Sequence, residues 1–151
     1  MMEVALVFDR NGNTICFHDP KGSTGGSIPD SRDLWEVLWE NRDRLGGVAH
    51  THPWDGPAHP SLTDLTTFDA VERALGKQLL WPVVSFTEMT CVVRNPLYGN
   101  GDVTHRWTAA GPLTITIEGI EELRDRGYEP TSACTVTSFI ESGFRTALQA
   151  L

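Results

Sequence analysis

Cysteine and long apolar runs are both scarce in this sequence, and each scarcity excludes a class of protein. The chain of 151 residues has three cysteines, Cys16, Cys91 and Cys134, and no two of them form a Cys-x-x-Cys pair. An odd number of scattered cysteines argues against a disulfide scaffold and against a zinc site made of thiolates. No apolar run approaches the roughly 20 residues of a transmembrane helix, so we expect no membrane span.

Positive charge is also in short supply. Twelve Lys and Arg residues stand against 20 Asp and Glu, for a net charge of −8 at pH 7. Negative charge repels nucleic-acid phosphates and anionic lipid headgroups, so we expect neither nucleic acid nor a membrane surface as a partner. The first residues lack the basic start and apolar core of a secretory signal. Together with the scattered thiols, this predicts a cytoplasmic location.

The first third of the chain predicts a hairpin and then a helix. The apolar runs 3–8 and 14–17 flank Asn11-Gly12, which is a strong hairpin turn signal. Apolar residues at helical spacing follow Pro29-Asp30 and continue to Gly46-Gly47. Because glycine often ends a helix, we expect these two glycines to stop it.

The second half predicts further strands and helices. Residues 79–84 and 89–94 are apolar runs joined by a short turn, and Pro82 inside the first run indicates a sheet edge or a bulge. Two half-exposed strands and two helices are predicted after them: 103–108, 113–118, 120–126 and 136–151. The sequence leaves open whether the last helix packs on the same domain or on a second copy, as a homodimer through this helix.

The most informative stretch is His50-Thr51-His52-Pro53, which follows the apolar run Gly47-Val48-Ala49. Such a run is typical of a buried strand, and alternate side chains of a strand share a face, so His50 and His52 point the same way. Both imidazoles can then reach one metal ion at about 2.0–2.1 Å. Pro53 has no N–H for a sheet ladder and is expected to end the strand.

A second element follows a proline-containing loop. Ser61 precedes an apolar helix predicted over residues 62–75, with Gly76 as its stop, and Asp64 lies three residues after Ser61. This spacing returns the Asp64 carboxylate toward the strand end where the two histidines point. Ser-x-x-Asp is also a capping box that only starts a helix, and the two interpretations do not exclude each other. Two His and one Asp leave a fourth zinc position for water, as in catalytic sites.

His50-Thr51-His52-Pro53 with Pro60-Ser61-Leu62-Thr63-Asp64 resembles the signature of the JAMM (JAB/MPN+) zinc metalloprotease family. That signature is His-Ser/Thr-His-Pro, seven residues, then Ser-x-x-Asp, with a Glu far upstream. The resemblance extends less strictly from about Glu3 to Arg94. It implies an α/β protein of the cytidine-deaminase-like MPN/JAB fold, with a mixed, largely antiparallel sheet flanked by helices. Residues 1–112 would form the catalytic domain, and residues 113–151 an extension packed on it.

The resemblance also implies ligands and a base. His50, His52 and Asp64 would bind one Zn²⁺ per chain. Glu3, just before the first apolar run, matches the family's general base, which takes a proton from water and returns it to the leaving amine. The other acidic residues weighed for this role are explained more simply as solvated or turn residues: Glu36, Glu40 and Asp55.

Three further residues near the motif have a functional and a structural interpretation. Ser61 resembles the family serine that stabilises the oxyanion of the tetrahedral intermediate, and its alternative is a plain N-cap. Trp54 follows Pro53 and could line a substrate groove or pack. His59 lies in the motif loop and is interpreted as a rim residue that touches substrate.

The function implied by the resemblance is that of a zinc metallo-isopeptidase or peptidase. It would cleave at the C-terminal tail of a ubiquitin or ubiquitin-like protein or its conjugate, by direct attack of a zinc-bound water. The compact chain matches a minimal prokaryotic or phage-type member, so a small prokaryotic ubiquitin-like or sulfur-carrier protein is as good a substrate as ubiquitin. Two alternatives stay open: an inactive scaffold or binding module, and a zinc hydrolase of a small amide or cell-wall peptide.

Overall fold

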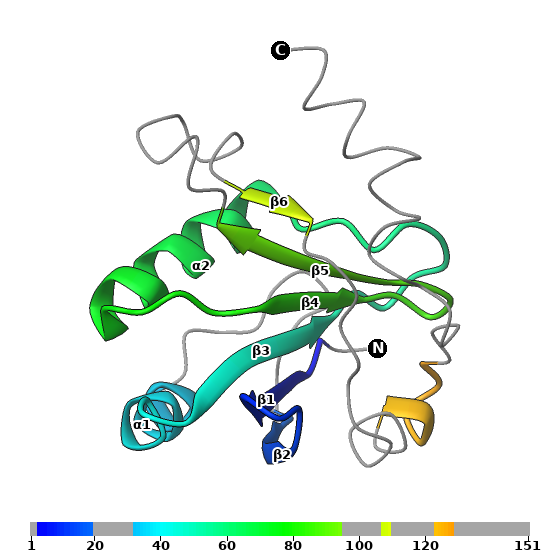
Figure 1. Ribbon diagram of the computed structural model, residues 1–151. Helices are drawn as coiled ribbons and strands as arrows, with labels where there is room; N and C mark the ends of the chain where they lie inside the picture. Colours follow the sequence, from blue (N-terminus) through cyan, green and yellow to red (C-terminus); the bar gives the residue numbers. More distant parts are fainter. Residues whose placement is uncertain (1–2, 20–31, 95–106, 110–122, 129–151) are drawn as a thin grey trace.

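The computed structural model describes residues 3–19, 32–94, 107–109 and 123–128 (Figure 1). These residues form a mixed α/β structure with one six-stranded sheet and two helices. The elements in chain order are β1 (Ala5–Asp9), β2 (Thr14–His18), α1 (Arg32–Glu40), β3 (Leu45–Thr51), α2 (Leu62–Leu75), β4 (Trp81–Val84), β5 (Met89–Arg94) and β6 (Trp107–Ala109). The strand order across the sheet is β2-β1-β3-β4-β5-β6.

The sheet is largely antiparallel, as predicted, with one parallel pair at its centre. Every neighbouring pair runs antiparallel except β3 and β4. Two parallel strands need a crossover connection, and α2 supplies it. In such a unit the carboxyl end of the first strand and the N-terminus of the helix lie at the same edge, where ligands commonly bind.

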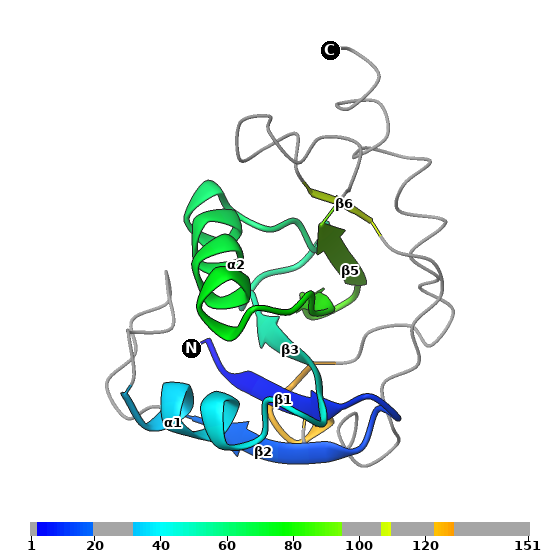
Figure 2. The ribbon, with the colours of Figure 1, turned by 60° about the vertical axis from the view of Figure 1, so that its left-hand side comes forward.

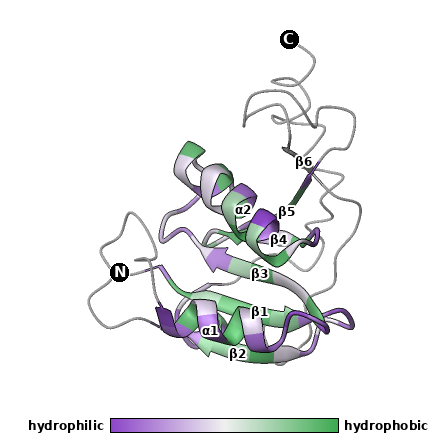
Figure 3. Ribbon diagram, turned by 90° about the vertical axis from the view of Figure 1, so that its left-hand side faces the viewer, coloured by the Kyte–Doolittle hydropathy of each residue, from purple (hydrophilic) through white to green (hydrophobic). Residues whose placement is uncertain are grey.

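Each face of the sheet carries its own apolar cluster. Both helices contribute to the first cluster, in which Val48 of β3 and Phe68 of α2 are buried and Leu34 and Trp35 of α1 pack against them. Figures 2 and 3 show α1 beside β1 and β2, and α2 beside β3 to β5. The opposite face is covered by the turn 123–128, whose Leu123 and Tyr128 belong to the second cluster.

Several predicted elements are confirmed. The hairpin of β1 and β2 turns at Asn11-Gly12, where Gly12 has a φ of 83°. The second helix spans Leu62–Leu75, with Ser61 as its N-cap and Gly76 in the left-handed conformation at its C-terminus. β4 and β5 pair antiparallel, and the Ser85 N–H donates to the Glu88 carbonyl in the turn between them.

The prediction that Gly46-Gly47 stop the first helix is wrong. α1 ends at Glu40, and both glycines lie inside β3. A Cβ at Gly46 would collide with the carbonyl oxygen of Asp9, and one at Gly47 with that of Leu80. Neighbouring backbones approach these positions too closely for a side chain, which is a second common reason for glycine in a strand.

The prediction that Pro82 marks a sheet edge or a bulge is also wrong, because β4 lies between β3 and β5 and pairs with β5 through Pro82 without a shift of register. On the β3 side, a bridge joins Gly47 to Leu80, and regular pairing begins again only at Val83, opposite His50. Pro82 therefore falls where the ladder to β3 is interrupted, and this gap accommodates a residue without an N–H.

The last third is described only in part. β6 overlaps the end of the strand predicted over residues 103–108, and residues 123–124 are helical before the chain turns. The strand predicted over 113–118, the helix over 136–151 and the homodimer it would form lie outside the described residues, and the domain boundary at residue 112 stays a prediction. Neither α1 nor α2, the helices in the described part, has the length and apolar character that crossing a bilayer requires.

Candidate metal centre

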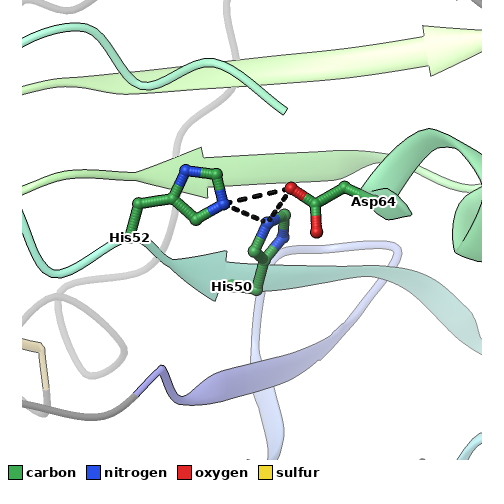
Figure 4. Close-up of side chains that lie close together, drawn as sticks. All are labelled: His50, His52 and Asp64. Atoms are coloured by element: carbon green, nitrogen blue, oxygen red, sulfur yellow. Dashed lines mark hydrogen bonds and ion pairs between the residues drawn. The ribbon is translucent and has the colours of Figure 1, made fainter. Parts of the chain in front are cut away.

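Three polar atoms converge at the carboxyl end of β3 (Figure 4). His50 lies near the end of β3, His52 follows it, and Asp64 comes from the first turn of α2. The two Nε2 atoms of the histidines are 3.1 Å apart. Oδ2 of Asp64 lies 3.1 Å from Nε2 of His52 and 3.2 Å from Nε2 of His50. The structure thus brings together the three residues predicted as metal ligands.

With Asp64 ionised, as its lowered pKa favours, no arrangement of protons satisfies all three sides of this triangle. An ionised carboxylate only accepts hydrogen bonds, and an imidazole nitrogen either donates or accepts. If both Nε2 atoms carry protons, both donate to Asp64, but they then face each other as two donors. If one of them lacks its proton, its lone pair faces the Asp64 oxygen. A cation among the three atoms resolves the conflict, because each can offer it a lone pair.

The dimensions of the triangle also fit a small metal ion. Tetrahedral zinc with bonds of about 2.0–2.1 Å holds its ligand atoms about 3.3–3.4 Å apart. The three measured separations, 3.1, 3.1 and 3.2 Å, are only slightly shorter. The two nitrogens and one oxygen therefore suit a divalent cation that accepts nitrogen and oxygen ligands. The other ring nitrogen of His52, Nδ1, is buried and has no hydrogen-bond partner among the described residues.

Asp64 starts the helix and faces the histidines with the same oxygen. Its Oδ2 accepts a hydrogen bond of 2.8 Å from the Ser61 N–H, and Oγ of Ser61 accepts one of 3.0 Å from the Asp64 N–H. This is the capping box that the sequence left as an alternative, and it coexists with the triangle. Burial raises the pKa of the Asp64 carboxyl, but hydrogen bonds from His50, His52 and Ser61 outweigh it and hold that pKa well below its usual range.

Aromatic rings enclose the two histidines, which are 5% and 2% exposed. The ring of His50 lies edge-on to Phe68, with centroids 5.6 Å apart. Trp54 covers His52 at a centroid distance of 4.2 Å while remaining 41% exposed itself. Trp54 therefore both packs on a candidate ligand and presents apolar surface beside the site, so the two interpretations of this residue are compatible.

Glu3 lies beside the triangle and is not part of it. Its Oε1 is 3.9 Å from Nε2 of His52, and the residue is 3% exposed. Pairing of Ala5 with His50 between β1 and β3, continued by two residues, places Glu3 opposite His52 on the same face of the sheet. The other acidic residues considered from sequence are all exposed: Glu36, Glu40 and Asp55.

The remaining motif residues lie at the rim. Ser61 is exposed. Its hydroxyl oxygen caps α2 by accepting the hydrogen bond from the Asp64 N–H. His59 is exposed as well. Its pKa is lowered, because the partial desolvation of the ring and the charge of His52 together outweigh the raising effect of Glu88.

The sequence assigned no role to Thr51, the last residue of β3, which is hydrogen-bonded to Val4, the residue after Glu3. Its hydroxyl accepts a hydrogen bond of 2.9 Å from the Val4 N–H. The neighbouring segments are 47 residues apart in sequence, and the signal that would have found this contact is the antiparallel pairing of the first strand with the motif strand.

No family model matches this chain, and a search of curated proteins finds no match either. What the fold and the site define is a mixed α/β protein with a His-His-Asp group that could bind a metal ion.

Proposed function

We propose that this chain is a zinc-dependent metallo-isopeptidase or peptidase of the JAMM type, with an MPN/JAB fold. The observation that carries the proposal is the triangle of His50, His52 and Asp64, whose three sides no proton arrangement satisfies while Asp64 is ionised. A buried carboxylate, Glu3, stands 3.9 Å from one corner of it. Three protein ligands that leave a position for water are typical of catalytic zinc sites, and a carboxylate beside them can serve as the general base.

The chemistry divides among the named residues. A zinc ion held by His50, His52 and Asp64 would supply a Lewis acid and a water of lowered pKa. Glu3 takes a proton from the attacking water and delivers it to the leaving nitrogen, so its carboxylate returns to the starting state. Ser61 uses its hydroxyl oxygen as an acceptor for the cap, which leaves its proton available to donate to a developing oxyanion.

The proposed substrate is the extended C-terminal tail of a ubiquitin-like protein or its conjugate. Trp54 presents apolar surface beside His52, and His59 is exposed in the same motif loop. An extended tail could pair with backbone near the site, which is a common mode of peptide recognition. The substrate choice rests on the motif resemblance, and cytoplasmic ubiquitin-like or sulfur-carrier proteins are the partners to test first.

The test compares wild type with Glu3→Gln, which keeps the size of the side chain and removes its basicity. Zinc content would be measured beside cleavage of a ubiquitin-like C-terminal fusion. We expect one zinc per chain in both proteins and a rate lower by about 10²–10⁴ in the variant, the usual range for losing a general base.

Three other results have clear meanings. Absence of zinc from both proteins, prepared without chelator, would refute the metal centre. Zinc in both without cleavage of the fusion, but with cleavage in a panel of small amides and cell-wall peptides, would replace the substrate class. Zinc in both and no hydrolysis of any substrate would favour an inactive scaffold.

A further inference from the structure

Thr51 holds the chain immediately after Glu3. Its hydroxyl accepts a hydrogen bond of 2.9 Å from the Val4 N–H and lies 3.5 Å from the Val4 carbonyl oxygen. The Thr51 N–H in turn donates to the same carbonyl at 3.0 Å. Three contacts thus join one pair of residues, and Thr51 is only 1% exposed.

The position of Val4 determines where the Glu3 side chain points. Val4 lies in the apolar cluster with Leu123 and Tyr128, on the face of the sheet opposite the triangle. Successive side chains of an extended chain point to opposite faces, so Glu3 is directed to the face of His50 and His52. Release of the Val4 backbone would loosen the segment that aims the carboxylate at His52.

We propose that Thr51 is a positioning residue for Glu3, an inference that rests on the proposed function in which Glu3 is the general base. The side chain alternation that sends His50 and His52 to the site sends Thr51 to the other face, where its hydroxyl reaches Val4. The segment 50–52 at the end of β3 therefore carries the two nitrogen ligands and, between them, the group that holds the base in register. Valine at this position would keep the shape and leave the buried Val4 N–H without its acceptor.

The test uses three variants of the full chain. Thr51→Val removes the hydroxyl, and Thr51→Ser retains it. Thr90→Val is the matched control, because Thr90 of β5 is fully buried and its hydroxyl has no hydrogen-bond partner among the described residues. Each protein is examined for zinc content, hydrogen exchange at the Val4 amide, kcat and KM. With cobalt in place of zinc, the paramagnetic shift of the Glu3 side-chain protons reports their distance from the metal.

For Thr51→Val we expect one metal per chain, faster exchange at Val4 by about 10-fold, and a smaller paramagnetic shift at Glu3. We expect kcat to fall by about 10-fold with KM within about twofold, because the lost interaction acts on the chemical step. Thr51→Ser should restore all of these, and Thr90→Val should resemble wild type.

The inference is overturned if Thr51→Val keeps wild-type exchange at Val4 and a wild-type shift at Glu3. It is also overturned if Thr90→Val lowers kcat as much as Thr51→Val does. A wild type that cleaves nothing would instead refute the proposed function. The exchange and paramagnetic measurements would then still decide whether Thr51 places Glu3 beside the metal, since neither depends on turnover.

Discussion

Two carboxylates at opposite ends of α2 have different surroundings. Glu72, in the last turn, is 4% exposed and is fully provided with donors. Its Oε2 accepts hydrogen bonds from the Leu79 N–H at 3.2 Å and the indole N–H of Trp81 at 2.8 Å. Its Oε1 accepts one of 2.9 Å from the guanidinium of Arg94. Each contact pairs a donor with an acceptor, so this cluster ties α2 to β4 and β5 without a metal ion.

Asp64, in the first turn, instead faces two imidazole nitrogens that also face each other at 3.1 Å. Both carboxylates are shielded from solvent, Glu72 fully and Asp64 in part, so burial alone does not explain the contrast. The difference lies in whether the partners can be satisfied together. Complete pairing marks a structural tie, and a group of mutually conflicting partners marks a place where a cation belongs.

The largest effect is expected from removing one of the three residues of the triangle. We expect His52→Ala to lose stoichiometric zinc binding, a larger effect than the 10–100-fold typical of losing an outer-shell partner. His59→Ala, an exposed histidine near the same loop, should keep one zinc per chain. Metal analysis of both folded proteins checks this, and retention of zinc by the His52 variant would refute the triangle as the metal site.

At the other end of α2, Arg94→Met should destabilise the fold and leave metal binding intact. Glu72 would stay buried without its cation, which costs about 3 kcal/mol in the free energy of unfolding. The matched control is Arg32→Met, whose pair with Glu36 lies on the surface and should contribute nothing measurable. Urea unfolding compares the two. Equal stabilities, or zinc lost from folded Arg94→Met, would contradict the separation of the two clusters.

The smallest expected change concerns the helix cap that Asp64 shares with Ser61. Ser61→Ala should lower the free energy of unfolding by about 1 kcal/mol, whereas Ser61→Gly should cost only a few tenths. The oxyanion role predicts that both variants lose about 10²–10³ in kcat, since neither has a hydroxyl. Thermal unfolding and steady-state rates separate the two roles. Wild-type rates in both variants would leave Ser61 as a cap alone.

Much of the candidate site could be predicted because it depends on local geometry. Alternation along a strand places His50 and His52 on one face, and the spacing of Ser61 and Asp64 specifies both the cap and the direction of the carboxylate. The bounds of α2 follow from the same cap and from Gly76 at its end. These features need only the few residues around them.

Errors arose where a residue has two common uses. Glycine ends helices and also allows close backbone approach in strands, and Gly46-Gly47 serve the second purpose. Proline is typical of sheet edges, yet Pro82 lies in a central strand where the ladder to β3 is interrupted. The choice depends on which strands become neighbours, and residues close in sequence carry no information about that.

Local sequence patterns were enough to identify the side chains that could bind a metal and to put two of them on one face. The folded chain was needed to show that the three candidate ligand atoms lie within 3.2 Å of one another and that Glu3 stands beside them. The reason is that both facts depend on pairing between distant segments. β1 pairs with β3, Thr51 holds Val4 across 47 residues, and α2 returns the chain to the end of β3.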